Sequence, residues 1–175
     1  EVLRTDEFGP VALYLMLSTR LDQKVALAAA DGWGGDEYVV YRADDRVCAG
    51  LAIEGDDDVE TGEIADALES WAAQSPEGTT DLTVEGSRLT FETCDPGADA
   101  EAIGNGAPLD VLSLPVIRTQ IYGSFLGAGN RPDDSSCFAN RVMAVLTVEQ
   151  LFSETYVASP EGEAALAGVR SDCGL

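Results

Sequence analysis

The feature that most constrains the fold of this 175-residue chain is a glycine-rich segment, Asp31-Gly32-Trp33-Gly34-Gly35-Asp36. Apolar residues precede the segment at helical spacing, and the β-rich run Tyr38–Tyr41 follows it. Closely spaced glycines end a helix and let the backbone turn sharply. This glycine-rich segment is therefore predicted to be a structural motif, a joint between a helix and a strand with an aromatic ring packed into it. Its residues are Gly32, Trp33, Gly34, Gly35 and Asp36.

Hydrophobic periodicity predicts the elements on both sides of this joint. Pro10 suits the first turn of a helix, and the apolar residues after it predict one helix over about 10–30. Alternating apolar residues over 47–53 predict a second strand after Tyr38–Tyr41, and the run Asp56-Asp57-Asp58 is predicted to open a second helix. Strands over 80–85 and 88–94 are expected to follow.

This order repeats helix, strand, strand twice, which predicts an α+β domain of αββαββ order. We expect a four-stranded antiparallel sheet with two helices on one face, spanning residues 1–97. Residues 98–114 are rich in Gly, Pro and Asp and are predicted to be a linker or wrapping loop. Residues 115–175 show helical periodicity and are predicted to form a small helical subdomain stapled by a disulfide.

The expected helices of this subdomain have recognisable ends. Pro115 begins the first, and glycines from Gly127 onward end it. A second helix starts near Cys137, and the residues Thr147 to Gln150 have the form of a capping box that begins a short third helix. The last helix starts at Ser159 and ends near the fourth cysteine.

Four cysteines without any histidine or C-x-x-C pair favour disulfides over a zinc site. Two disulfides indicate an oxidising compartment. Cys48 and Cys94 each lie opposite the apolar face of their own strand, so a bridge between them on the outer surface of the sheet is the simplest of the three connectivities. Cys137 and Cys173 then pair if their helices pack antiparallel.

The formal net charge of −22 excludes ordinary binding to nucleic acids and to anionic membranes, because phosphates are repelled over most of the surface. Solubility or salt adaptation, mimicry of DNA and a docking face for a basic partner remain open. The longest fully apolar run, residues 11–17, is too short to span a bilayer, so no transmembrane segment is expected.

The lack of histidine excludes Ser-His-Asp and Cys-His catalysis within this chain. A Ser–Lys dyad would need Lys24, which falls on the polar side of its helix, and no pair of carboxylates is marked by an aromatic cleft pattern. We therefore predict no catalytic residue, no cofactor and no enzymatic activity.

Asp56, Asp57 and Asp58 are the candidate ligands for a calcium ion, since carboxylates are the oxygen ligands that calcium prefers. The segment does not follow the EF-hand pattern. The alternative is that these acids cap the helix that starts there and interact with its positive end.

The glycine-rich segment with Tyr38–Tyr41 after it resembles a GWGGD segment of uncharacterised exported proteins and lipoproteins of bacteria, many of them actinobacterial. The resemblance implies an exported location and this helix-to-strand architecture. Longer relatives carry an amino-terminal region similar to metallopeptidases, which this sequence lacks. Their peptidase activity does not carry over, because a chain without histidine has no H-E-x-x-H motif.

We therefore expect a non-catalytic exported domain on the outer face of a bacterial envelope or in an extracellular assembly, acting through contact with a protein partner. Because the sequence opens at Glu1 without a methionine or a leader, it is expected to be a mature exported form or a piece of something longer. The alternatives are the carboxy-terminal module of a larger metallopeptidase-like polypeptide and a calcium-dependent adhesion or sensing module.

Overall fold

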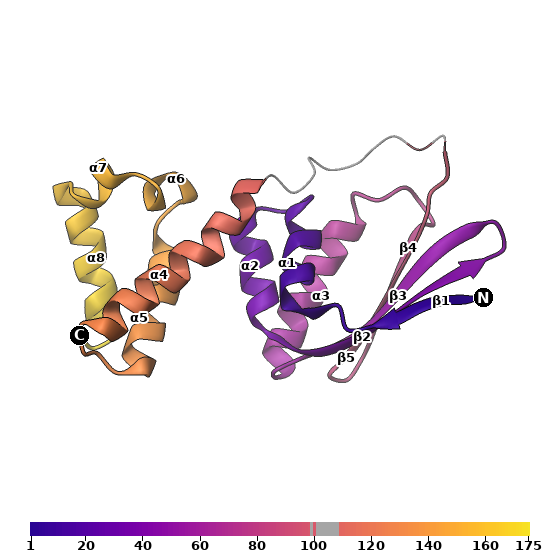
Figure 1. The fold of residues 1–175 in the computed structure, drawn as a ribbon, viewed down its shortest axis with the longest axis horizontal. Coiled ribbons are helices and arrows are strands. Elements are labelled where there is room, and N and C mark those ends of the chain that lie inside the picture. Colours follow the sequence, from indigo (N-terminus) through magenta and orange to yellow (C-terminus); the bar gives the residue numbers. More distant parts are fainter. Residues whose placement is uncertain (99, 101–108) are drawn as a thin grey trace. The chain divides into compact units, whose positions relative to one another are not determined.

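The computed structural model describes residues 1–98, 100 and 109–175 and divides into two compact units, Glu1–Val111 and Leu112–Leu175. Much of the expected linker, residues 99 and 101–108, lies outside the described residues. The end of the expected linker is helical: η1 spans Leu109–Leu112 and α4 begins at Ser113. Figure 1 shows the elements along the chain.

Unit 1 contains, in chain order, β1 (Val2–Asp6), α1 (Gly9–Ser18), α2 (Gln23–Asp31), β2 (Trp33–Ala43), β3 (Arg46–Gly55), α3 (Asp58–Ala72), β4 (Thr80–Glu85) and β5 (Arg88–Cys94). Its strands form one antiparallel sheet in the order β1-β2-β3-β5-β4. The α+β class and the antiparallel sheet are confirmed. The sheet has five strands, so the expectation of four was wrong.

The missed strand is β1, which pairs with β2 at the edge of the sheet. All five of its side chains are exposed, so they carry no alternation of buried and exposed positions. Its register with β2 also shifts between Val2 and Arg4. A short edge strand of this kind becomes recognisable only when its distant partner is in place.

The single helix expected over 10–30 is two helices, α1 and α2, so three helices instead of two cover one face of the sheet (Figure 1). The break falls where the Asp22 side chain accepts a hydrogen bond from the Lys24 backbone N–H and caps α2. Leu13 and Leu17 of α1 are completely buried against the sheet side of unit 1.

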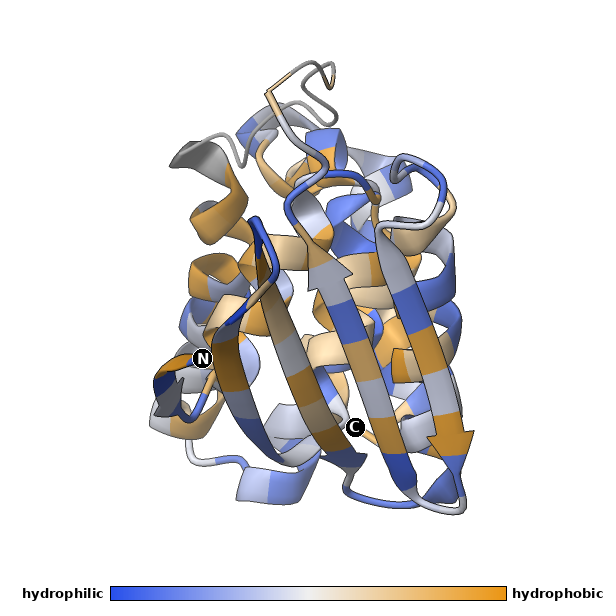
Figure 2. Ribbon diagram, turned by 90° about the vertical axis from the view of Figure 1, so that its right-hand side faces the viewer, coloured by the Kyte–Doolittle hydropathy of each residue, from blue (hydrophilic) through white to orange (hydrophobic). Residues whose placement is uncertain are grey.

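The core of unit 1 lies between α3 and the central strands. Phe91 of β5 packs edge-on against Trp71 of α3, with ring centroids 5.9 Å apart. Trp71 is 8% exposed, and its indole N–H donates to the Met16 carbonyl at 3.0 Å. The Arg20 guanidinium covers the Trp71 ring at 3.5 Å from the centroid. Figure 2 shows the alternating hydropathy along the strands that this one-sided core requires.

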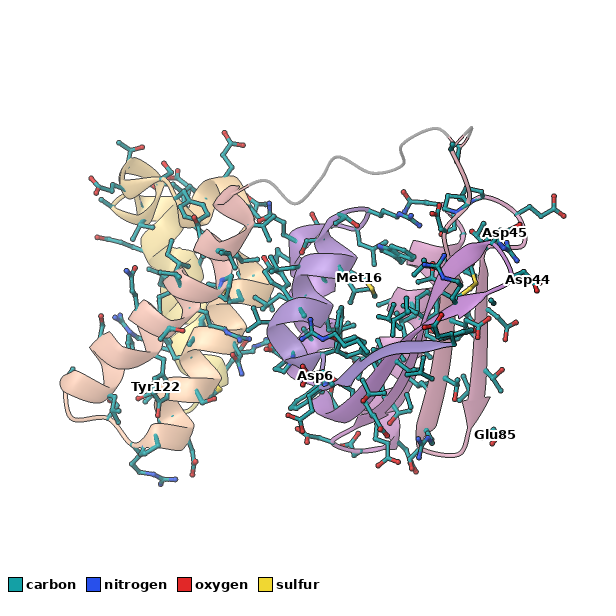
Figure 3. The ribbon with its side chains drawn as sticks, turned by 45° about the vertical axis from the view of Figure 1, so that its right-hand side comes forward. Asp6, Met16, Asp44, Asp45, Glu85 and Tyr122 are labelled. Atoms are coloured by element: carbon teal, nitrogen blue, oxygen red, sulfur yellow. A yellow bond between two sulfur atoms is a disulfide. The ribbon has the colours of Figure 1, made fainter. Side chains whose placement is uncertain are left out.

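The two hairpins of the sheet turn at opposite ends. Asp44 and Asp45 form the turn between β2 and β3, and Glu85 lies at the turn between β4 and β5 (Figure 3). Asp44 has a φ of 54°, the left-handed conformation that short hairpin turns require and that aspartate tolerates better than most residues.

Unit 2 contains α4 (Ser113–Gly127), α5 (Pro132–Val145), α6 (Val148–Leu151), α7 (Glu154–Val157) and α8 (Pro160–Asp172). The capping box is confirmed, because the Thr147 hydroxyl accepts from the Gln150 N–H while the Gln150 side chain accepts from the Thr147 N–H. The short helix α7 has no counterpart in the sequence prediction. No helix among the described residues is both long and apolar enough to cross a membrane.

The two disulfides are Cys48–Cys94 and Cys137–Cys173, the pairs expected from the sequence. Cys48 and Cys94 are directly opposite each other on β3 and β5, on the face of the sheet away from α3. The bridge therefore lies on the outer side of the sheet, as expected; Cys48 is only 2% exposed, whereas Cys94 is partly exposed. The residue paired with Cys48 on β2 is Tyr41.

Each disulfide lies within one unit, so its removal should destabilise that unit selectively. Replacing both members of either pair with alanine should lower the free energy of unfolding of its unit by about 4 kcal/mol, the chain-entropy value for loops of these lengths. Both tryptophans belong to unit 1, so denaturant melts followed by tryptophan fluorescence should respond to loss of Cys48–Cys94 only. Circular dichroism should detect both losses. Equal effects of both pairs on fluorescence would contradict the assignment.

Candidate functional site: the outer face of the sheet

The glycine segment is a tightly packed joint, as the sequence predicts. Gly32 caps the end of α2, and its carbonyl accepts a hydrogen bond from the Asp56 N–H at 2.9 Å. A Cβ on Gly34 would lie 2.8 Å from the carbonyl carbon of Gly55, closer than real Cβ contacts come. Glycine at position 34 therefore lets the start of β2 approach the end of β3 backbone to backbone.

Asp36 binds three donors at this joint. Its carboxylate accepts hydrogen bonds from the backbone N–H groups of Phe8 and Gly9 at 2.6 and 2.7 Å, and from the Trp33 indole N–H at 2.6 Å. The two backbone donors are at the start of α1, where an anion is favoured by the helix dipole. These contacts account for the motif as a structural joint.

The three calcium candidates lie at the start of α3. The Asp57 carboxylate accepts from the backbone N–H groups of Val59 and Glu60 at 2.8 and 2.9 Å, which is the capping alternative raised by the sequence. Partial desolvation, with nearby carboxylates in second place, raises the pKa of Glu60 above its usual value. Across residues 1–98, 100 and 109–175, no group of three or more His, Cys, Asp or Glu side chains is arranged to hold a metal ion.

The face of the sheet opposite α3 carries a different set of side chains. Because Phe91 faces α3, its neighbours in β5 point to the other face, and strand pairing extends that face to β2, β3 and β4. Among the described residues of unit 1, no helix covers this outer face (Figures 1 and 2). The outer face is defined here by the outward-facing residues of β2 to β5.

The centre of the outer face is flat and apolar. Val39 and Tyr41 of β2 lie beside Gly50 and Ala52 of β3, and all four are partly exposed. A Cβ on Gly50 would lie 3.4 Å from Val39 Cγ1 and 4.0 Å from Tyr41 Cε1, so both side chains lean over the glycine. The missing side chain lets the Tyr41 ring reach across β3, where its hydroxyl donates to the Glu92 carboxylate of β5. This hydrogen bond raises the pKa of Tyr41.

Carboxylates surround this apolar centre. Strand pairing places exposed Glu37, Glu54, Glu92, Asp81 and Glu85 on the outer face. The strands β2 to β5 contribute two cations to the same face. Arg88 lies opposite Glu54 and Glu85 in the register, and Arg46 lies opposite Ala43 beside the β2–β3 turn. An apolar centre with an aromatic residue and a polar rim is the usual anatomy of a protein–protein interface.

A family described as "Domain of unknown function (DUF8575)" matches residues 1–103, so the chain belongs to this family. The matched residues include every strand and α1, α2 and α3, whereas α4 to α8 lie outside them. The chain has no match among curated proteins and none among solved structures.

The outer face was missed by motif-based reasoning because its residues come from four strands. One signal was available: Gly50 interrupts an otherwise well-formed strand, and a glycine inside a strand often marks the close approach of another group. In this fold the approaching group is the Tyr41 ring.

The joint gives a matched test of backbone packing. Gly34→Ala should lower the free energy of unfolding by about 2 kcal/mol, because the new methyl group meets the Gly55 backbone. Gly35→Ala is the control, since a Cβ there has no neighbour within 4 Å and should change stability by less than about 0.5 kcal/mol. Urea denaturation followed by tryptophan fluorescence measures both. Equal destabilisation by the two variants would contradict the close approach at Gly34.

Proposed function

We propose that this protein is a non-catalytic exported domain that binds a protein partner through the outer face of its sheet. The observation that carries the proposal is the arrangement of that face. A flat apolar centre around Tyr41 and Gly50 lies among five exposed carboxylates, and none of the helices described in its own unit lies over it.

The charge of the outer face indicates which class of partner it would bind. The outer face has five carboxylates and two guanidinium groups, and the whole chain carries a formal net charge of −22. The partner that fits is therefore a protein surface rich in Lys and Arg, which this field would attract and orient during encounter. Tyr41 would supply the buried aromatic anchor at the centre of the contact.

The exported location is supported by the two disulfides, because such bonds form and persist outside the reducing cytosol. The resemblance of the GWGGD segment to exported actinobacterial proteins supports the same location. The disulfides would keep each unit folded where no chaperone or reductant acts on it.

The location predicts the oxidation state of the native protein. Material taken from its native source and denatured without reductant, with thiols trapped at lysis, should show no free sulfhydryl by thiol titration. The same sample after reduction should show all four cysteines. Four sulfhydryls before reduction would contradict export to an oxidising compartment.

The contact surface predicts where a partner can be cross-linked. A photoreactive phenylalanine analogue in place of Thr90, exposed on the outer face, should give one covalent adduct in native envelope material. The same analogue in place of Glu69, exposed on α3, is the matched control and should give none. Mass spectrometry identifies the adduct.

Binding to the purified partner then tests the role of charge. Asp81→Lys should weaken binding by about tenfold and reduce its dependence on salt, since it reverses one rim charge at a position exposed to solvent. Glu69→Lys changes the net charge equally but lies on α3, so it should have a much smaller effect. Equal effects of the two substitutions, or equal cross-linking at Thr90 and Glu69, would contradict the assignment of this face.

A further inference from the structure

Unit 2 contains a half-open apolar groove of about 320 Å³, a volume at the lower end of small-molecule sites. One side is formed by α4 through Ile117, Ile121 and Phe125, which remain partly exposed. Val142 of α5 contributes to the lining from a buried position, and Leu166 of α8 lines the groove from another side. The apolar stripe of α4 is therefore only partly buried by the described residues of its own unit.

One end of the groove is held in a defined geometry. The rings of Phe125 and Phe138 stack with centroids 3.9 Å apart. Phe138 directly follows Cys137, and the disulfide from Cys137 to Cys173 joins the start of α5 to the end of α8. This disulfide therefore holds α5 and α8 together at the end of the groove where the aromatic pair lies.

The single charged residue among the described groove-lining residues is Arg170 of α8. Its guanidinium carbon lies 5.9 Å from the Phe125 centroid and 5.8 Å from the Phe138 centroid, within cation–π range of both rings. Within the described part of the chain, no carboxylate forms an ion pair with Arg170. Two other arginines of unit 2 differ: Arg131 pairs with Asp133 and Asp134, and Arg141 pairs with Asp172.

The composition of the groove lining is unusual for so acidic a chain. Asp and Glu outnumber Lys and Arg by 32 to 10, yet the described lining of the groove includes no acidic residue. An apolar cavity with one cation beside it matches an elongated apolar molecule with one anionic group. The net charge of −22 disfavours a multiply charged head group, so one carboxylate fits better than a phosphate.

We propose that the groove of unit 2 binds a single-chain carboxylic amphiphile, a fatty acid of medium length. The acyl chain lies among the aliphatic side chains of α4, α5 and α8, and the carboxylate pairs with Arg170. This site belongs to the helical unit, outside the residues matched by the family, and it is independent of the proposed protein contact on the sheet.

Isothermal titration calorimetry of the full chain with sodium dodecanoate, below its micellar concentration, tests the proposal. Wild-type protein should bind one dodecanoate, and Arg170→Gln should weaken that binding at least about tenfold, the effect of losing one charged hydrogen-bonding partner. Arg131→Gln is the matched control and should bind like wild type, because Arg131 is exposed and does not line the groove. Dodecanol should bind more weakly than dodecanoate and should not distinguish Arg170→Gln from wild type.

A second variant tests the apolar wall. Ile121→Glu places a carboxylate in the groove at a partly exposed position and should abolish dodecanoate binding while leaving the circular dichroism melt close to wild type. Absence of dodecanoate binding to wild type, or equal affinity of wild type and Arg170→Gln, would overturn the proposal. Binding to phosphatidylglycerol vesicles without binding of monomeric dodecanoate would also overturn it. Asp81→Lys should leave dodecanoate binding unchanged, which separates this site from the outer face of the sheet.

Discussion

The carboxylate of Asp36 connects parts of unit 1 that are distant from one another in the sequence. By accepting hydrogen bonds from Phe8, Gly9 and the Trp33 indole, it connects the start of α1 to β2. The same connection places β1, which ends just before α1, beside β2. Once this joint is closed, α1, α2 and α3 lie on one face of the sheet, and they leave the opposite face open.

The two faces of the sheet therefore serve different purposes. The inner face buries Leu51, Ile53, Leu89 and Phe91 and supplies most of the hydrophobic free energy of the unit. The outer face has smaller or charged side chains and a glycine that lets Tyr41 extend across β3. The Cys48–Cys94 disulfide joins β3 to β5 on this side of the sheet, which restricts the movement of the two strands without an apolar layer over them. Rigidity of this kind lowers the entropy that a binding surface loses when a partner docks.

Unit 2 is stabilised differently. Its helices α6 and α7 have only four residues each, and few large side chains of the unit, among them Phe138 and Val142, are deeply buried. The disulfide between α5 and α8 compensates for a small core by restricting the unfolded chain. The small core also leaves space beside α4, and the groove with Arg170 beside it is a consequence of that incomplete packing.

Local signals in the sequence determined much of this protein: the helix-to-strand joint at the glycine segment, the hairpins of β2–β3 and β4–β5, the capping box at Thr147 and both cysteine pairs. The joint, the hairpins and the capping box depend on residues that are neighbours in the chain. The cysteine pairs follow from the alternation within two strands and from the antiparallel packing of two helices. The break of the first helix is also local, since Asp22 caps α2 through the Lys24 N–H, although the sequence analysis missed it. Only the tertiary structure decided that β1 is a strand, that Asp36 binds the start of α1, and that Arg170 lies beside two aromatic rings. Those features arise from contacts between residues distant in the chain, and the free energy of such contacts is not encoded in any local pattern.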